Sequence, residues 1–211
     1  MPLEIINVEQ GSPEWFQARL GIPTASMFQT VMASGKGGGE SKTRLKYMRE
    51  LAYERRTGRQ SESFENAHTL RGREQEPKAR NLYAFAREVD PQQVGFMKNY
   101  GAGASPDSLI GENNGLEIKC CLPHIQIERL QDQRLPPEYR HQVQGCMWIA
   151  DRDRWDFMSY CPDLPPLIVP VKRDDAFIRQ IADAVELFNE ELEDLMAKLD
   201  GMRGVIVAEA A

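Results

Sequence analysis

The sequence has no long apolar run, and this absence excludes the usual membrane-spanning helix. No stretch of the 211 residues approaches the ~18–20 apolar residues needed to cross a bilayer. The first ten residues, MPLEIINVEQ, contain no basic segment followed by an apolar one, so we expect no signal peptide. Hydrophobic residues make up 41% and charged residues 27%, as in an ordinary globular protein. We therefore expect a cytoplasmic protein with no membrane partner, folded as a single domain over 1–211.

The sequence also lacks the cysteine and histidine patterns of common metal sites. The three histidines form no HxxxH or HExxH motif, which argues against zinc-hydrolase chemistry. No CxxC pair occurs, and in a cytoplasmic protein we expect reduced thiols. The four cysteines are Cys120, Cys121, Cys146 and Cys161.

The chain has no excess of basic residues, since its formal net charge is −6. That sum argues at first against a nucleic-acid partner, because phosphate contacts need Lys and Arg. The charges are unevenly distributed, however. Residues 42–59 hold seven basic residues and two acids, whereas residues 183–195 hold six acids and no base. These segments are either two solvated helix faces or a DNA-binding helix and an acidic helix that faces outward.

Helix signals occur mainly in the first half and near the end of the chain. Ser12-Pro13-Glu14 is typical of a helix start, with a Ser cap and Pro at the first position. Thr24 is expected to cap a second helix, and Pro77 to kink or restart a longer one. The predicted helices are 13–20, 24–32, 42–56, 64–88, 137–150 and 174–199.

Strand signals fill the middle of the chain. The predicted strands are 93–100, 101–110, 115–122, 154–161 and 166–172, and the second and third are joined by a GENNG turn. Helices followed by several strands, and then by further helices and strands, predict an α/β fold with a central mixed sheet flanked by helices.

The stretch SPDSLIGENNGLEIKCC (105–121) carries the residues of most chemical interest. A strand has a period of two, so Glu117 and Lys119 project from one face, and the turn can bring Asp107 beside Glu117. Two adjacent carboxylates repel each other unless a cation such as Mg²⁺ binds them. A metal-bound water can attack phosphorus, and Lys119 could stabilise the developing charge.

The Glu-x-Lys triplet alone is a weak signal. It occurs three times, at 40–42, 76–78 and 117–119, and only the last follows a Pro-Asp and a short turn. From the residues alone, the stretch is either a metal-dependent nuclease site or a solvated hairpin.

Three further segments occur with this hairpin in a recognisable order. Read together, ARLGIPTAS (18–26), GREQEPKA (72–79), SPDSL (105–109), GLEIKC (115–120) and HQVQGCMW (141–148) resemble the lambda-type phage exonucleases. These form the YqaJ-like viral recombinase family within the PD-(D/E)xK nuclease superfamily, whose core resembles that of restriction endonucleases. Five ordered matches are far more specific than any one of them.

The resemblance implies a Mg²⁺-dependent 5′→3′ exonuclease, in which Mn²⁺ is expected to substitute. Such an enzyme would digest one strand from double-stranded DNA ends and leave a 3′ overhang for a single-strand annealing protein. A ring-shaped homotrimer is also implied, as is a phage or prophage origin in a bacterial host cell. Two alternatives remain: an internally cutting or structure-specific endonuclease of the same superfamily, and a non-catalytic DNA-binding or assembly subunit.

The same resemblance assigns roles to individual residues. Asp107, Glu117 and Lys119 match the catalytic residues. The implied metal ligands are Asp107, Glu117, the main-chain carbonyl of Ile118, and Glu76. The implied DNA or 5′-phosphate contacts are Arg19, Ser26, Ser105 and Gln142.

The residues themselves support one of these assignments, and one position of the family pattern has no match in this sequence. Ser26 in the first turn of a helix would suit an anion, because free N–H groups and the helix dipole favour negative charge there. The family pattern also has an arginine shortly after the catalytic lysine. This sequence offers only His124 and Arg129, and neither aligns with that position.

Overall fold

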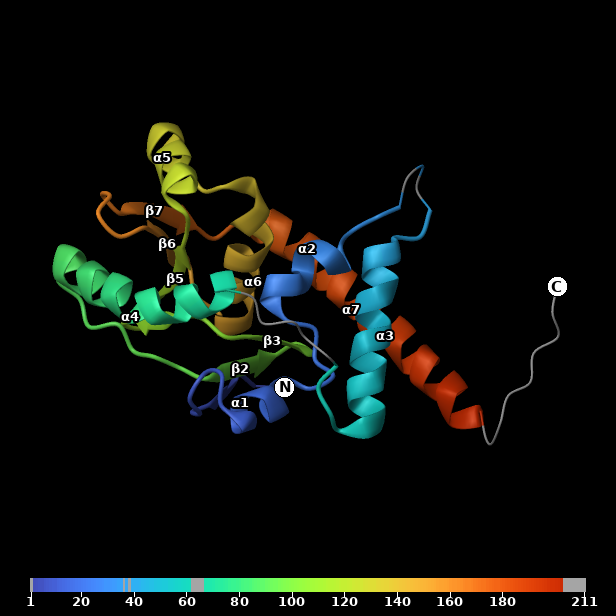
Figure 1. Ribbon diagram of the computed structural model, residues 1–211. Coiled ribbons are helices and arrows are strands. Elements are labelled where there is room, and N and C mark those ends of the chain that lie inside the picture. Colours follow the sequence, from blue (N-terminus) through green and yellow to red (C-terminus); the bar gives the residue numbers. More distant parts are fainter. Residues whose placement is uncertain (1, 36, 38, 62–66, 203–211) are drawn as a thin grey trace.

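The computed structural model describes residues 2–35, 37, 39–61 and 67–202, the side chains of residues 67–70 and 73 excepted (Figure 1). It is a mixed α/β structure with two sheets flanked by helices, which confirms the predicted fold class. No helix in the described part of the chain is both long and apolar enough to cross a membrane.

The smaller sheet has three antiparallel strands in the order β1-β2-β3. They are β1 (Glu4–Ile6), β2 (Phe96–Asn99) and β3 (Ala102–Ala104). Strand β1 was not predicted, because it is only three residues long and pairs with β2, about ninety residues later in the chain. The smaller sheet therefore depends on a strand pairing that no local sequence pattern predicts.

The larger sheet has four strands in the order β4-β5-β6-β7. They are β4 (Ser108–Ile110), β5 (Asn114–Cys120), β6 (Arg154–Tyr160) and β7 (Leu167–Lys172). The β5–β6 pair is parallel and the other two pairs are antiparallel. Since a parallel pair needs a long crossover, the helices between residues 120 and 154 carry the chain back to the start of β6.

The predicted strand 101–110 is wrong as one element. It is divided at residues 105–107 into β3 and β4, which belong to different sheets. Pro106 has no N–H to donate and interrupts a strand ladder at this point. The break is decisive for the site, because Ser105 and Asp107 lie on either side of it at the junction of the two sheets.

Seven α-helices flank the sheets in the described residues. They are α1 (Pro13–Arg19), α2 (Phe28–Val31), α3 (Lys42–Thr57), α4 (Ala67–Arg87), α5 (Pro123–Asp132), α6 (Arg140–Ala150) and α7 (Asp175–Gly201). The Ser12 cap of α1 is confirmed, since its Oγ accepts from the N–H of Trp15 at 3.2 Å. The sequence analysis missed α5.

Two helix predictions need correction. The segment after Thr24 is a three-residue 3₁₀ turn, Ala25–Met27, followed by the single turn of α2. The Thr24 side chain makes no capping bond and contacts the Ser26 hydroxyl instead, at 3.2 Å. Helix α4 continues through Pro77, which is exposed, so the alternative of a new start there is wrong, and a kink at this position stays a prediction. The predicted beginning of this helix at residues 64–66 lies outside the described residues.

The two faces of β5 meet two separate parts of the core. Leu116 and Ile118 pack with Ala79 and Tyr83 of α4 in a small cluster. The main cluster lies between the sheets and helices α2, α3, α6 and α7. The main cluster includes Met147, Trp148, Trp155 and Phe157. Glu117 projects from the opposite face of β5 to Leu116 and Ile118, as the period of two predicted.

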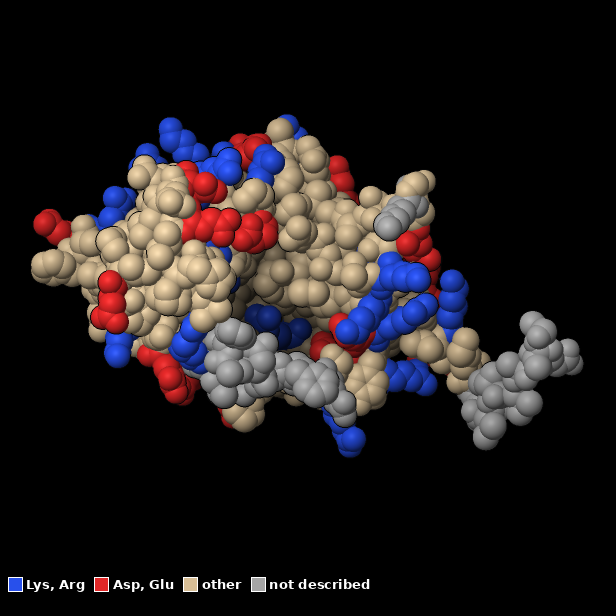
Figure 2. All heavy atoms as spheres, turned by 45° about the horizontal axis from the view of Figure 1, so that its top comes forward, with Lys and Arg blue, Asp and Glu red and all other residues tan. Residues whose placement is uncertain are grey.

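The basic and acidic segments form helices that lie side by side. Helix α3 packs along α7, and ion pairs join them, with Arg44 to Glu191 at 2.5 Å and Arg55 to Glu193 at 2.6 Å. Arg56 also pairs with Asp200. Of the six acids in residues 183–195, Glu191 and Glu193 thus pair with α3, whereas the other four are exposed, as expected of a helix that faces outward. Figure 2 shows Lys and Arg side chains gathered on the part of the surface near α3.

Candidate active site

The register of the β4–β5 hairpin brings two carboxylates together. Ser108 pairs with Leu116, so continuing the register by one residue places Asp107 opposite Glu117. The Oδ2 atom of Asp107 accepts the main-chain N–H of Ile118 at 2.5 Å. The aspartate is thus fixed to β5 by a backbone hydrogen bond, with its side chain beside Glu117 as the sequence predicted.

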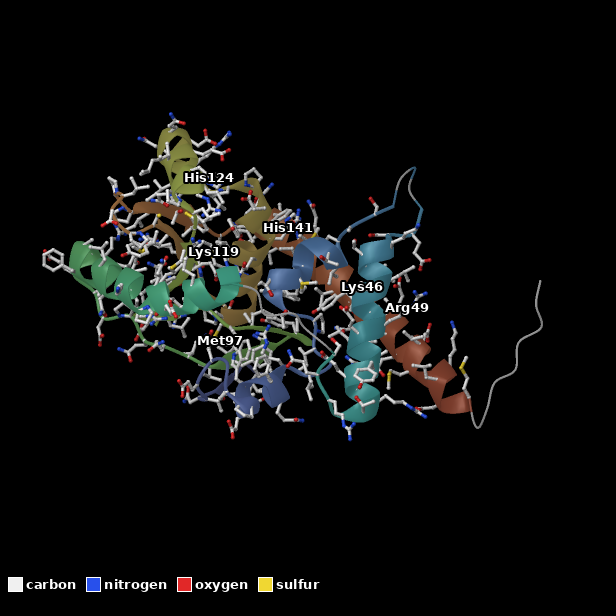
Figure 3. All side chains as sticks on the ribbon, in the orientation of Figure 1. Lys46, Arg49, Met97, Lys119, His124 and His141 are labelled. Carbon is white, nitrogen blue, oxygen red and sulfur yellow. The ribbon has the colours of Figure 1, made fainter. Side chains whose placement is uncertain are left out.

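Glu117 is buried, with 2% of its surface exposed. Its Oε1 atom receives Nζ of Lys119 at 2.5 Å and Nε2 of Gln142, from α6, at 2.6 Å. Its Oε2 atom has no hydrogen-bond partner among the described residues. A buried carboxylate oxygen without a partner is costly, and this one is available to a cation. Figure 3 labels Lys119, whose side chain is half-buried, near the middle of the view.

The charges at this site shift the pKa values of Asp107 and Lys119. Burial and the negative charges of Glu117 and Glu76 raise the pKa of Asp107 well above its usual range. Burial acts to lower the pKa of Lys119, but the charges of Glu117 and Asp107 outweigh it and raise this pKa. Lys119 is therefore a cation at neutral pH and acts as a hydrogen-bond donor rather than as a base.

A second group of side chains surrounds Ser105. Its Oγ atom accepts from Nη1 of Arg19 at 2.8 Å and from Nε1 of Trp15 at 2.9 Å. The guanidinium of Arg19 lies 4.1 Å from the centre of the Trp15 ring, which fixes its plane. Since the Ser105 oxygen accepts twice, its own hydrogen points to another acceptor. Arg19 and Ser105 together thus present donors to an anion.

The carboxylate group and the Ser105 group line one cavity of about 170 Å³. Ser26 reaches this cavity from the 3₁₀ turn and is exposed. The helix-dipole argument for Ser26 fails, because a three-residue 3₁₀ turn carries little of the dipole that an α-helix builds up. The cavity is lined by Gln10, Trp15, Arg19, Thr24, Ala25, Ser26, Ser105, Asp107, Glu117, Lys119, Gln142 and Cys146.

Glu76 does not line this cavity. Its carboxylate pairs with Arg80 one turn along α4. No group of three or more His, Cys, Asp or Glu side chains in the described ranges is arranged to hold a metal ion. Of the residues expected to bind metal, Asp107 and Glu117 therefore lie in the cavity, and Glu76 lies near enough for its charge to raise the pKa of Asp107. Ile118 lies between Glu117 and Lys119 on β5, and its side chain is in the small core cluster.

Two residues that the sequence analysis did not select hold the Asp107 segment in place. Arg80 donates to Oγ of Ser108 at 3.1 Å and to the main-chain carbonyl of Asp107 at 3.3 Å. Gln10 donates to the carbonyl of Pro106 at 2.9 Å. Both contacts join positions far apart in the sequence, and a single sequence carries no signal for them.

The two possible substitutes for the missing arginine have other positions. Arg129 is buried and donates to Oγ of Ser159 and to the hydroxyl of Tyr139, both at 3.0 Å. It therefore has a structural role in packing α5 against β6. His124 is exposed on α5 and is labelled in Figure 3. Neither lines the cavity.

The residues present fit a hard divalent cation. Asp107 and Oε2 of Glu117 supply adjacent carboxylate oxygens, and the raised pKa of Asp107 reflects a repulsion that a bound cation would relieve. Oxygen ligands of this type suit Mg²⁺ or Mn²⁺ rather than Zn²⁺, which prefers nitrogen and sulfur.

Residues 14–153 match the model of the YqaJ-like viral recombinase domain. The chain is similar to the alkaline exonuclease LHK-Exo from Laribacter hongkongensis, with 36% identity and a TM-score of 0.82 over 90% of this chain and 97% of that one. The complex of LHK-Exo with dAMP gives the same coverage and TM-score at 37% identity. This likeness confirms the predicted PD-(D/E)xK type of fold.

A phage-related exonuclease from Haemophilus somnus 129PT has a TM-score of 0.67 and 17% identity, over 84% of this chain and 96% of that one. At this identity the likeness concerns the fold alone. No curated protein matches the chain.

Proposed function

This chain belongs to the YqaJ-like viral recombinase domain family, and on that basis we propose that it is a divalent-metal-dependent 5′→3′ exonuclease. The family and the similarity to an alkaline exonuclease support a DNA exonuclease role. The proposed substrate is a double-stranded DNA end. One strand is hydrolysed from its 5′ terminus, and the remaining 3′ overhang serves single-strand annealing recombination.

The side chains of Asp107 and Glu117 would hold the cation, which we propose to be Mg²⁺ with Mn²⁺ as a substitute. When bound, such a cation makes a coordinated water more acidic and takes up charge on the phosphoryl oxygens. Gln142 orients Glu117 through its hydrogen bond to Oε1, which leaves Oε2 without a partner and available to a cation. Arg80 and Gln10 hold the main-chain carbonyls of Asp107 and Pro106, respectively.

Lys119 provides the positive charge next to the reacting phosphate. Because its raised pKa keeps it protonated, it can donate to the attacking water and to the phosphoryl oxygens as negative charge develops. Its present partner, Oε1 of Glu117, accepts hydrogen bonds from both Lys119 and Gln142. Lys119 can therefore turn toward substrate while Gln142 still satisfies Glu117.

The Arg19–Ser105 pair is proposed to bind the terminal 5′-phosphate. A guanidinium binds phosphate with a planar pair of donors, and Trp15 already holds its plane. Ser26 is a further donor on the wall of the same cavity. Holding the terminal phosphate at this position would place the first phosphodiester near Asp107 and Glu117. It would also restrict hydrolysis to the 5′ end.

The observation that carries the proposal is that one cavity contains both the carboxylate–lysine group and the phosphate-binding pair. The test is digestion of end-labelled linear duplexes, with and without a 5′-phosphate, in Mg²⁺ or in chelator. We expect 5′→3′ degradation in Mg²⁺, faster on phosphorylated ends, and no degradation in chelator. Degradation from the 3′ end, or full activity of Asp107→Ala, would refute the assignment.

The same assay separates the two alternatives. An endonuclease of the superfamily would cut covalently closed circular duplex, whereas the proposed exonuclease leaves the circle intact. A non-catalytic subunit would degrade neither substrate. The retained Asp107, Glu117 and Lys119, brought together in one place, favour catalysis over that alternative.

We further propose that the protein works as a homotrimeric ring around DNA, together with a single-strand annealing protein. A ring slows dissociation without strong phosphate binding, which suits an acidic enzyme that must move along its substrate. Sedimentation at micromolar protein concentration tests the ring, and a strict monomer would count against it.

A further inference from the structure

The outward face of α3 carries a stripe of exposed basic side chains. Lys42, Lys46 and Arg49 follow each other at spacings of four and three residues, and Tyr53 comes four residues later. These spacings place all four on one face of a helix. The opposite face holds the buried residues Tyr47, Met48, Leu51 and Ala52. We call Lys42, Lys46 and Arg49 the α3 stripe.

The fold makes little use of the α3 stripe. The other arginines of α3, namely Arg44, Arg55 and Arg56, pair with acids of α7. Within the stripe, Lys46 lies 3.5 Å from Glu50 of its own helix. That pair is solvent-exposed at its lysine end, and such pairs contribute little to stability. Three positive charges thus face solvent together in a chain whose net charge is −6.

The helix that carries the stripe also borders a cavity next to the active-site cavity. This second cavity, of about 320 Å³, shares Trp15, Arg19, Thr24 and Ser26 with the active-site cavity. The inner side of α3 lines it with Tyr47, Glu50, Leu51 and Glu54, while the stripe lies on the outward face of the same helix. In Figure 2 the basic side chains near α3 lie beside a hollow in the surface. Figure 3 labels Lys46 and Arg49 on α3 and the half-buried Lys119 near the middle of the view.

We propose that the α3 stripe binds the sugar–phosphate backbone of the duplex part of the substrate, just beyond the end being digested. This inference rests on the proposed nuclease function and adds a binding surface to it. From Lys42 to Arg49 the helix rises about 10 Å. That length matches roughly three base-pair steps at 3.4 Å per strand. Contacts to phosphate carry no sequence information, as an exonuclease requires.

Duplex DNA fits this surface better than a single strand. Single-strand binding surfaces combine a basic groove with a series of aromatic side chains on which successive bases stack. The α3 stripe has point charges and one neighbouring aromatic, Tyr53, whose side chain is exposed. Such a surface can contact phosphates but offers no platform for a run of unstacked bases.

The test compares two variants with the same loss of charge. In the first, Lys42, Lys46 and Arg49 are replaced by Gln. In the control, three exposed residues of β6, β7 and α7 are replaced by Gln, namely Arg154, Lys172 and Arg179. Binding of each protein to a fluorescent blunt-ended hairpin duplex is measured by anisotropy in chelator, from low to moderate salt. A single strand of equal length is measured in parallel.

Each phosphate contact contributes about 0.9 to the slope of log K against log salt on duplex DNA. We therefore expect the stripe variant to lose about 2–3 from this slope on duplex, and the control variant to keep it. Both should hydrolyse a small chromogenic phosphodiester in Mg²⁺ at the wild-type rate and melt at the wild-type temperature, since neither alters the cavity or the core.

Three results would overturn the inference: an unchanged slope for the stripe variant, equal losses for both variants, or a loss confined to the single strand. Failure of the proposed function is a separate outcome. In that case the wild-type protein would not degrade linear duplex in Mg²⁺, whatever the binding slopes show.

Discussion

The hydrogen bond from Gln142 to Glu117 offers the sharpest single test of how the site is held. The Nε2 atom of Gln142 donates to Oε1 of Glu117 at 2.6 Å, and Glu117 is 2% exposed. Gln142→Leu keeps a similar side-chain size and good helix propensity, but it removes the donor. Water has little access to the buried carboxylate and cannot easily replace it.

The expected magnitude follows from the type of hydrogen bond. One made to a charged group contributes about 1.5–3 kcal/mol. For a chain of this size, 1 kcal/mol shifts Tm by about 2–4 °C. Gln142→Leu should therefore lower the free energy of unfolding by about 1.5–3 kcal/mol and Tm by about 3–12 °C. Gln180→Leu, at an exposed position of α7, is the matched control and should change Tm little.

A double-mutant cycle identifies the partner. In a Glu117→Gln background the carboxylate is absent, so Gln142→Leu should cost far less than in the wild type. The interaction energy between the two changes should reach about 1.5 kcal/mol or more. Urea unfolding in chelator measures it. Effects that add within about 0.5 kcal/mol would refute the view that Gln142 acts through Glu117.

The same variant has a catalytic readout. If Gln142 directs Oε2 of Glu117 into the cavity, its loss should weaken cation binding. Partners of metal ligands typically contribute about 10–100-fold to metal affinity. The Mg²⁺ concentration for half-maximal DNA degradation should therefore rise by about tenfold or more, and saturating Mg²⁺ should restore much of the rate. An unchanged Mg²⁺ dependence would contradict the positioning role.

Two further predictions concern Asp107 and Gly115. The raised pKa of Asp107 means that the protonated form stabilises the folded state, so in chelator this contribution is lost as pH rises through the raised pKa. In chelator, Tm of the wild type should then fall relative to Tm of Asp107→Asn as pH rises above the usual carboxyl range. Added Mg²⁺ should reduce this difference in Tm. Parallel profiles of Tm against pH for the two proteins in chelator would contradict the prediction. Gly115 leaves no room for a side chain, since a Cβ there would lie 2.3 Å from the Trp155 ring. Gly115→Ala should cost about 1–3 kcal/mol and lower Tm by about 2–12 °C, as measured by thermal unfolding; an unchanged Tm would show that Trp155 can move aside.

The hairpin was predictable because its information is local. A period of two, a Gly/Asn turn and the alternation around Glu117 fix which side chains share a face, and the structure places Asp107, Glu117 and Lys119 accordingly. Helix α1 was predictable for the same reason, since its cap and first proline lie within three residues. The fold class followed from the order of such elements.

Other features depend on pairings between distant residues. The strand predicted over 101–110 divides between two sheets because its first half pairs with β2 and its second half pairs with β5. Arg80 and Gln10 reach the Asp107 segment from α4 and the N-terminal region. Glu76 matched a motif, but in the structure its charge is paired with Arg80. The partners of these side chains are set only when the chain folds.

The sequence by itself predicted the class of chemistry through five ordered motifs that resemble one family, because each motif is a few adjacent residues. The tertiary structure decided how the site is completed. It places Ser105 at the junction of two sheets, brings Arg19 and Trp15 to it from α1, and sets Gln142 on Glu117. It also divides the basic charge of α3 into a part neutralised by α7 and a stripe that faces solvent. Both results require contacts between residues that lie more than twenty positions apart in the chain. The hydrophobic core, rather than the local sequence pattern, selects those contacts.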